Sequence, residues 1–421
     1  ANLGKEIQER GKISSIVHYH NSYFVGFLMD GILLLEKQKE TNHYQIQSLP
    51  INSGVFCLKK DRFQDVVWIG TDGQGVYLYS NPLYSIKSMV LSNYTEKIER
   101  PVRAIYLDDE RTFWVGTKGN GILKIYDYEF DKNISDCRAE VLTTSNSALS
   151  SNAVYCFAKS HRNLLWIGDE EGLTYYSYRE KRIKSIPIRI GNEDFKYIHD
   201  IYETADSELW LASVGMGVVK ARIAGTPDNP VIVDAQRYII NDGELGSNYF
   251  FTIYAENEAN LLFGNKGYGV FRYNETTNGL EPVSTHKYEN MTLNNILAIS
   301  KDSSNNYLFG TSYGLIKYTS ETSYQLFNAK NGFLNNTIHA ILRNSSDNFW
   351  LSTNLGLINF DTKRNVFRSY GFGDGLKVVE FSDGAAFRDS RTGTLFFGGI
   401  NGVVAIRADG RPEQLYMPPV Y

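Results

Sequence analysis

The stretch Val67–Tyr77 reads VWIGTDGQGVY, and the stretch Phe113–Leu123 reads FWVGTKGNGIL. Both contain an aromatic residue among aliphatic ones, then a Gly-Thr pair, a short turn that ends in glycine, and a second apolar run. A phrase that recurs at a fixed distance is the signature of a repeat architecture, in which each copy builds one structural unit. The recurrence of this phrase therefore decides the fold class.

Nine copies of the phrase can be read along the chain. The first residue of the Gly-Thr pair, or the residue that replaces it, marks each copy: Gly26, Gly70, Gly116, Gly168, Ala212, Gly264, Gly310, Ser352 and Gly398. Successive markers are 42 to 52 residues apart, which matches the blades of β-propellers, where the period is about 40–50 residues.

The pattern around each marker is that of short β-strands. Val102–Leu107 is β-branched and aromatic, a turn follows, and Thr112–Val115 and Ile122–Tyr126 are further apolar runs separated by a Gly-rich turn. This order predicts antiparallel hairpins. Apolar residues on both faces, as in Leu164–Ile167, suit sheets stacked radially between neighbours. A long β-sandwich and a β-solenoid are the alternatives, but a sandwich has no reason to repeat one phrase nine times and a solenoid rung is shorter.

A glycine precedes the last apolar run of eight copies, where a hairpin turn with positive φ favours glycine. These glycines are Gly75, Gly121, Gly172, Gly217, Gly269, Gly314, Gly356 and Gly402. The sequence therefore predicts an all-β chain, a β-propeller of four-stranded antiparallel blades.

Composition excludes several classes of function. The 421 residues carry a net charge of −4 and no basic run, which argues against direct contact with nucleic acid. The three cysteines and seven histidines show no C-x-x-C or H-E-x-x-H spacing. We therefore predict no metal, no cofactor and no catalytic residue.

The phrase resembles the two-component regulator propeller repeat, and the resemblance covers Tyr23 to Ile406. Asn331–Ile338 (NGFLNNTI) and Asp374–Phe381 (DGLKVVEF) are similar to the segments that join successive blades in that family. Met417–Pro419 is similar to the link into the family's sandwich domain. The resemblance implies the extracytoplasmic sensor region of a Bacteroidetes hybrid two-component or one-component regulator.

That family carries two propellers of about seven blades, which implies a division of the nine copies. Residues 1–93 are expected to be two blades of a preceding, truncated propeller, residues 94–410 a seven-bladed propeller, and residues 411–421 the start of a linker to a sandwich domain. A single ring of nine blades and a ring of eight are the alternatives. Two orphan blades would expose unpaired strand edges, which weighs against the division.

Two histidines occupy equivalent places in their repeats. His199 and His339 each follow an isoleucine at the start of the first strand of a copy, and the same slot holds Arg103, Tyr155, Phe251 and Leu297 in other copies. We expect this slot near the central channel or a seam between blades. A metal-binding pair is one interpretation, and two separately satisfied imidazoles far apart around the ring is the favoured one.

Residues that break the repeat are the better candidates for binding. The two long spacings place extra residues in 127–151 and 223–247, and long loops on a rigid scaffold often bind ligands. Hairpin turns and the segments that lead into each blade are expected on one face, where amides, rings and an amine suit a polar ligand. These candidates are Asn152, Asn248, Tyr249, Lys266, Tyr268, Asn295, Tyr313, Asn336 and Asn354. The alternative is that each Asn only satisfies turn backbone.

The resemblance makes a sensor the expected function. It implies a periplasmic region that binds an oligosaccharide or other small polar ligand, forms a homodimer, and signals through a sandwich domain and a membrane helix to a cytoplasmic kinase or DNA-binding part. A propeller enzyme acting on polysaccharide, as a lyase or glycosidase, is one alternative. A protein-interaction scaffold is another.

Overall fold

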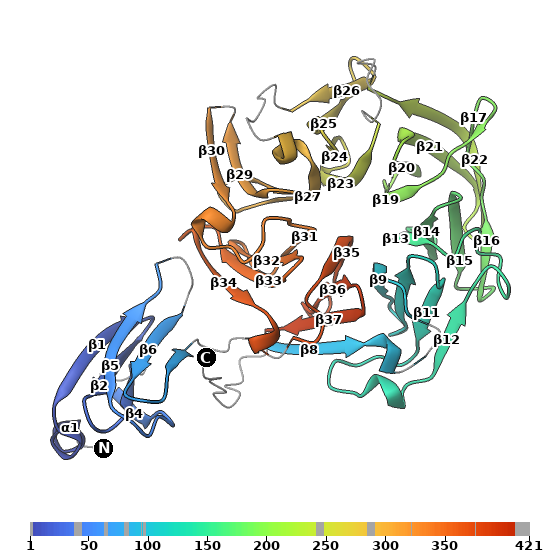
Figure 1. The fold of residues 1–421 in the computed structure, drawn as a ribbon. Helices are drawn as coiled ribbons and strands as arrows, with labels where there is room; N and C mark the ends of the chain where they lie inside the picture. The colour runs from blue at the N-terminus through green and yellow to red at the C-terminus, as the bar shows by residue number, and fades with distance from the viewer. Residues whose placement is uncertain are drawn as a thin grey trace. The chain divides into compact units, whose positions relative to one another are not determined.

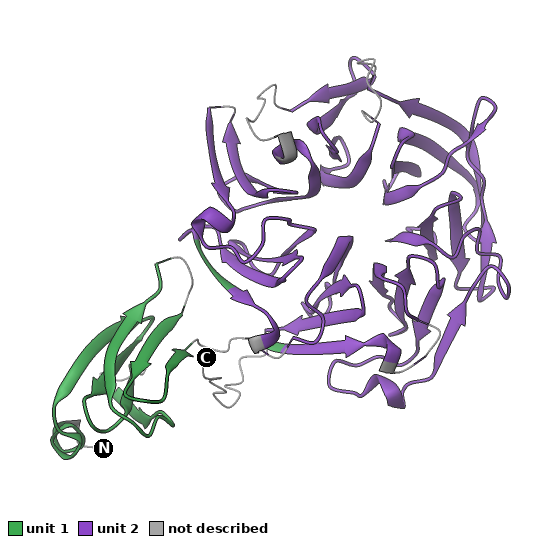
Figure 2. Cartoon of the chain, in the orientation of Figure 1, with its two compact units in different colours: residues 1–85, 366–368, 409–421 green, residues 86–365, 369–408 purple. Residues whose placement is uncertain are grey.

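The computed structural model describes residues 3–37, 44–62, 66–79, 84–93, 95, 98–240, 248–283, 291–320, 322–374 and 376–408. The described residues divide into two compact units (Figure 2). One contains residues 1–85 and 366–368, and the other contains residues 86–365 and 369–408. The expected linker, residues 411–421, lies outside the described residues.

Seven four-stranded antiparallel sheets succeed one another from β9 to β37 in the described chain. The first four are β9 (Val102–Leu107), β10 (Phe113–Thr117), β11 (Ile122–Ile125) and β12 (Ala139–Leu142); β13 (Val154–Lys159), β14 (Leu164–Asp169), β15 (Leu173–Ser177) and β16 (Arg182–Ser185); β19 (Ile198–Glu203), β20 (Glu208–Ser213), β21 (Gly217–Thr226) and β22 (Asn229–Tyr238); β23 (Phe250–Asn257), β24 (Asn260–Asn265), β25 (Gly269–Asn274) and β26 (Gly279–Pro282).

The other three sheets are β27 (Ile296–Lys301), β28 (Tyr307–Thr311), β29 (Gly314–Ser320) and β30 (Ser323–Phe327); β31 (Ala340–Arg343), β32 (Asn348–Thr353), β33 (Gly356–Asp361) and β34 (Val366–Tyr370); β35 (Phe381–Arg388), β36 (Leu395–Gly399), β37 (Gly402–Arg407) and β8 (Ser85–Val90). A two-stranded ribbon, β17 (Arg189–Ile190) and β18 (Glu193–Asp194), lies against β22.

The sheets stand as blades around an axis. The first strand of each sheet contacts the first strand of the next, and β35 of the last sheet contacts β9 of the first, so the circle closes (Figure 1). The predicted fold class, an all-β propeller of four-stranded antiparallel blades, is therefore confirmed.

The marker glycine explains why the phrase repeats. A Cβ on Gly116 would lie 2.7 Å from Cγ1 of Val154, the residue that begins the inner strand of the next blade. A Cβ on Gly398 would lie 2.6 Å from Cγ1 of Val102, which closes the circle with the same contact. Because the valine of the neighbouring inner strand lies this close, the position favours a residue without a side chain at most seams.

The threonine after the glycine fixes the hairpin turn. Thr117 is fully buried, its hydroxyl donates to the carbonyl of Gly121 at 2.9 Å, and it accepts from the N–H of Asn120 at 2.9 Å. Gly121 has φ of +76°. The equivalent glycines of the other copies also have positive φ, as the sequence predicts. Gly402 is the exception, because its φ is not in the positive range.

Replacing Thr117 by valine is expected to destabilise the propeller by about 1–3 kcal/mol while the shape is kept. The Asn120 N–H loses its acceptor, and the Gly121 carbonyl keeps only the backbone N–H of residue 117 as a donor. Urea unfolding measures the change. Thr226→Val, at an exposed hairpin end, is the control and is expected to change stability by less than about 0.5 kcal/mol. Equal losses in both variants would contradict the role of the turn hydroxyl.

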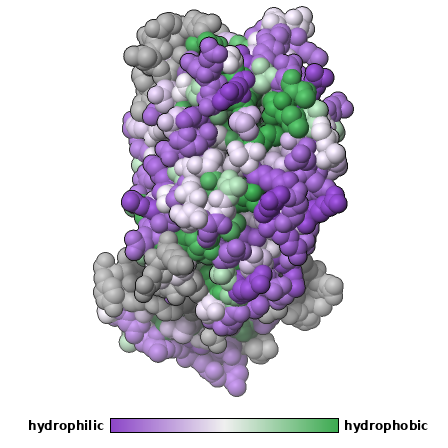
Figure 3. Space-filling view, turned by 90° about the vertical axis from the view of Figure 1, so that its right-hand side faces the viewer, coloured by the Kyte–Doolittle hydropathy of each residue, from purple (hydrophilic) through white to green (hydrophobic). Residues whose placement is uncertain are grey.

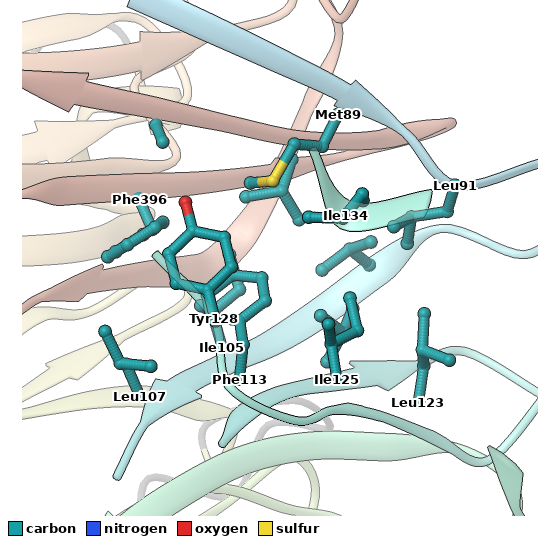
Figure 4. Packing of buried hydrophobic residues seen from close by; sticks show 14 of the residues in the cluster. Met89, Leu91, Ile105, Leu107, Phe113, Leu123, Ile125, Tyr128, Ile134 and Phe396 are labelled. Carbon is teal, nitrogen blue, oxygen red and sulfur yellow. The ribbon is translucent and has the colours of Figure 1, made fainter. Parts of the chain in front are cut away.

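Strand β8 lies within residues 1–93, the segment that the sequence analysis assigns to a preceding propeller, but it completes the sheet of β35–β37. Met89 and Leu91 are buried against Ile105, Phe113 and other side chains from the first and last blades (Figure 4). The outer edge of β37 thus pairs with a strand from the other end of the chain. This covers the edge of β37 and gives the last sheet a fourth strand, as in the other blades.

The other unit holds two further copies of the repeat. A four-stranded sheet consists of β1 (Ile13–Tyr19), β2 (Ser22–Phe27), β3 (Ile32–Lys37) and β4 (Tyr44–Ser48), and a three-stranded sheet consists of β5 (Val55–Lys60), β6 (Val67–Thr71) and β7 (Val76–Tyr79). Helix α1 (Leu3–Arg10) precedes them. A Cβ on Gly26 would lie 2.7 Å from Cγ1 of Val55, so these sheets pack with the same seam.

Candidate functional site

The side chains that face the central channel are placed there by a recurring bulge. In β9, β13, β19 and β23 the pairing register with the next strand shifts at one residue. The residues at the shift are Arg103, Tyr155, His199 and Phe251. A bulged residue leaves the alternation of the pleat, so its side chain is aimed in a new direction.

A cavity of about 190 Å³ lies between the inner strands. Tyr155, His199, Phe251 and His339 all line it. Both histidines line this cavity, from two different blades. We call Arg103, Tyr155, His199, Phe251, His339 and Asp383 the channel cluster.

His339 is held by polar partners on both sides of its ring. Its Nδ1 lies 2.5 Å from Oδ1 of Asp383, and its Nε2 lies 2.6 Å from Oδ1 of Asn354. Arg103 Nη1 lies 3.7 Å from Oδ2 of the same Asp383. Burial opposes ionisation of the Asp383 carboxyl, but the hydrogen bond with His339 and the charges of His339 and Arg103 hold its pKa below the ordinary value.

His199 lies in an aromatic stack. Its ring is 4.3 Å from that of Tyr155 at 22° and 5.5 Å from that of Phe251 at 88°. Burial is the largest influence on this imidazole, and the positive charges of Arg103 and Lys118 act in the same direction, against Asp383. Together they lower the pKa of His199 to about 3.

Replacing His199 by phenylalanine is expected to remove a source of acid lability. Below pH 6.5 the unfolded chain binds a proton at His199 that the folded chain binds only near pH 3, so the stability linked to neutral His199 is present above pH 6.5 and is lost as pH falls towards 3. Between pH 6.5 and 4.5 the wild type should lose about 2 kcal/mol relative to His199→Phe. Urea unfolding at both pH values measures this. A stability difference that does not change with pH would show that His199 titrates normally.

Three of the predicted asparagines serve loop backbone. Asn152 Oδ1 accepts from the N–H of Thr144, Asn248 Oδ1 accepts from Ile240, and Asn336 Oδ1 accepts from Ala329, at 2.8 to 2.9 Å. The carbonyl oxygens of Asn152 and Asn248 also accept N–H groups of the preceding hairpin turn. Hairpin turns and blade-leading segments therefore lie side by side, and a ligand role for these residues stays a prediction.

The other predicted residues lie in the same hairpins and leading segments. Lys266 and Asn295 form a β-bridge to each other, and Tyr249 forms one with Val214. Tyr249 is 36% exposed. Tyr268 and Tyr313 pack against hydrophobic clusters of their blades. Of all the predicted residues, the structure brings His199, His339 and Asn354 together around the channel.

The described parts of the two predicted long segments do not line the cavity. Residues 127–151 hold β12, and 223–240 lengthen the outer hairpin β21–β22, while 241–247 lie outside the described residues. Val231 and Val233 of β22 are each 50% exposed. Figure 3, which views the right-hand side of Figure 1, shows mainly hydrophilic residues with small hydrophobic patches. This side of the blades carries no large apolar patch in that view.

Sequence reasoning recognised the slot of Arg103 and Tyr155 but selected only its histidines, and it missed Asp383. The register of β35 shifts between Phe381 and Ala386, so Asp383 does not align with the slot in the sequence. Arg103 occupies the same position in its repeat as His199, and this equivalence is the sequence signal that could have identified it. Among the described residues, no group of three His, Cys, Asp or Glu side chains is placed to hold a metal ion.

No family model matches the sequence. Translation initiation factor 6 of Saccharolobus solfataricus is 31% identical over 140 residues, which are 30% of this chain and 57% of that protein. The match leaves most of the chain uncovered, and it does not assign a family.

The fold is similar to solved β-propeller structures. An extracellular domain assigned to the hybrid two-component system BT3049 from B. thetaiotaomicron is 24% identical, with a TM-score of 0.62, over 95% of this chain and 52% of that one. The extracellular domain assigned to the one-component system BT4673 is 17% identical, with a TM-score of 0.60, over 96% and 53%. The chain thus spans about half the length of each.

An enzyme also shares the fold. A catalytically inactive variant of virginiamycin B lyase from Staphylococcus aureus, solved with quinupristin, is 15% identical, with a TM-score of 0.58, over 77% of this chain and 99% of that one. At these identities the likeness establishes the fold alone. No helix in the described part of the chain is long and apolar enough to cross a membrane.

Proposed function

We propose that this chain is the ligand-sensing region of an extracytoplasmic, membrane-bound regulatory protein. The observation that carries the proposal is the likeness to extracellular domains assigned to two regulatory systems, which extends over 95% and 96% of the chain. The likeness therefore includes residues of both compact units. We further propose that the region lies in the periplasm and forms a homodimer. It signals through a sandwich domain and a membrane segment to a kinase or DNA-binding part.

The ligand of this sensor is a glycan derived from a polysaccharide. Imidazoles, a phenol and an aromatic ring line the cavity, and Arg103 adds a guanidinium beside Tyr155; these groups suit hydroxyl groups and sugar rings. Signalling requires that the ligand bind one state of the protein better than the other. A coupling of about 1–3 kcal/mol between ligand binding and output is typical of such switches.

A thermal-shift screen with glycan fragments tests the proposal. A sensor is expected to show a melting temperature that rises with ligand concentration, and the sugars should be recovered unchanged. New sugar products over many turnovers would contradict it. In cells, the fragment that raises the melting temperature should also induce the regulated genes, and a ligand that binds without induction would contradict sensing.

An enzyme is the second candidate, and the pairing of His339 with Asp383 favours it, since such a pair can move protons. Against it, the other nitrogen of His339 lies 2.6 Å from Asn354, so a catalytic imidazole would first have to leave that amide. Product analysis in the same screen decides between the two.

A further inference from the structure

Arg103 is a partly buried cation whose guanidinium makes no hydrogen bond to the described residues. Its side chain is 14% exposed, and its nearest charged partner is Asp383 at 3.7 Å, beyond hydrogen-bond distance. Its Nε is buried and has no hydrogen-bond partner. Within the described residues, none of its N–H donors makes a hydrogen bond. A buried donor without a partner costs about 1–3 kcal/mol, so a group that accepts from this guanidinium would be bound favourably.

The next two blades continue the same pattern. The Tyr155 ring lies 5.9 Å from the guanidinium carbon of Arg103 and stacks on His199. Neither the Tyr155 hydroxyl nor the His199 imidazole has a hydrogen-bond partner in the part of the chain that the structure describes. The opposite side of the channel differs, because His339 and Asp383 bond each other. Polar groups without partners are therefore gathered on adjacent inner strands, where a ligand can reach them.

Arg103 and Lys118 are the cations of this side, and Asp200, which also lines the cavity, has both carboxyl oxygens engaged by the N–H groups of Ile201 and Ile253. Lys118, in the turn after β10, is exposed, and no described residue forms an ion pair with it. Burial, followed by the charge of Arg103, lowers the pKa of His199 to about 3, with Lys118 acting in the same direction and Asp383 against it. His199 is thus neutral and can both donate and accept a hydrogen bond. Asp383 is engaged by His339 on its Oδ1, which leaves the fork of Arg103 for a second carboxylate.

We propose that Arg103, Tyr155 and His199 form a carboxylate-binding subsite at the channel. The guanidinium fork matches a planar carboxylate with two parallel hydrogen bonds, Tyr155 and His199 bond neighbouring hydroxyl groups, and Phe251 offers an aromatic edge. The cavity, about 190 Å³, is lined by Tyr155, His199 and Phe251, and Arg103 adjoins it through its contact with the Tyr155 ring. This inference rests on the proposed function in one respect: it specifies that the glycan is acidic, with a uronic acid at the end that enters the channel.

The test measures the affinity of the whole chain for three probes by titration calorimetry: trigalacturonate, the neutral galactotriose, and acetate. Trigalacturonate should bind at least tenfold more tightly than galactotriose. If acetate binds much more weakly than trigalacturonate, the carboxylate that the subsite recognises is carried by an acidic sugar. Acetate that binds as tightly as trigalacturonate identifies a free small acid and still supports the subsite. Equal affinities for the acidic and neutral sugars, or no binding of either carboxylate, would overturn it.

Variants locate the site. Arg103→Gln should weaken trigalacturonate binding tenfold or more, and Arg103→Lys, which keeps the charge but loses the fork, should fall between. Arg222→Gln, an exposed arginine on β21, is the matched control and should bind like the wild type. Should Arg103→Gln fail to fold, Arg103→Lys and His199→Phe carry the test. Full affinity in the folded channel variants would refute the subsite.

The outcomes also separate this inference from sensing. If trigalacturonate binds through Arg103 but induces no regulated gene, the subsite stands and the sensor function fails. If a neutral glycan binds and induces, and Arg103→Gln has no effect, the sensor function stands and the carboxylate subsite is wrong.

Discussion

A chain that begins at Tyr84 is expected to fold its propeller, whereas a chain that begins after Asn93 is expected not to. The shorter chain lacks β8, which pairs with β37 and closes the last sheet. Met89 and Leu91 are 0% and 1% exposed, and removing side chains of this kind costs about 2–5 kcal/mol each. Lys87 Nζ also donates to the carbonyl oxygens of Phe130 and Lys132, at 3.0 and 2.5 Å. The sum approaches the whole stability of a typical domain, about 5–15 kcal/mol.

Circular dichroism, thermal unfolding and gel filtration of the two chains measure this. The chain from Tyr84 should unfold in one cooperative transition. The chain that begins after Asn93 should aggregate through the exposed edge of β37. If both chains melted at the same temperature, β8 would be a passive strand, and the expected propeller boundary at residue 94 would suffice.

The period and the local pattern of the sequence predict the fold class because the seam is built from sequence-local features. A side chain at Gly116 has no room, because Val154, which begins the inner strand of the next copy of the repeat, lies against it. The assignment of β8 could not be predicted in this way. Its sheet neighbours β35–β37 lie at the other end of the chain, and nothing in residues 85–90 distinguishes a strand that pairs locally from one that pairs across the ring.

The channel cluster could be predicted in part. The slot equivalence of Arg103, Tyr155 and His199 can be read from the repeat, and one bulge per blade turns each of them into the channel. The contact between His339 and Asp383 depends on an irregular register in β35, which has no period to reveal it. Asn152 illustrates the opposite difficulty, because a side chain on the expected face can be engaged by its own loop.

Tryptophans of the repeat fill the space between blades, and Trp166 carries the largest expected single-residue effect. It is 0% exposed, and its indole N–H donates to Oε2 of Glu203, on the next blade, at 2.7 Å. The side chain of Glu203 is 1% exposed. Trp166→Ala would therefore open a large cavity, which costs about 3–5 kcal/mol. It would also take the hydrogen bond from a buried carboxylate, which costs about 1–3 kcal/mol more.

Urea unfolding of three variants separates the two effects. Trp166→Phe keeps most of the volume but loses the indole N–H, so its loss should be smaller than that of Trp166→Ala. Combining Trp166→Phe with Glu203→Gln should recover part of that loss, because a neutral amide is easier to bury than a carboxylate whose remaining partner, Arg162 Nε, lies 4.0 Å away. Phe372→Ala, at a side chain that is 73% exposed, is the control and should change stability by less than about 0.5 kcal/mol. If Trp166→Ala cost no more than this control, the indole would not hold the two blades together.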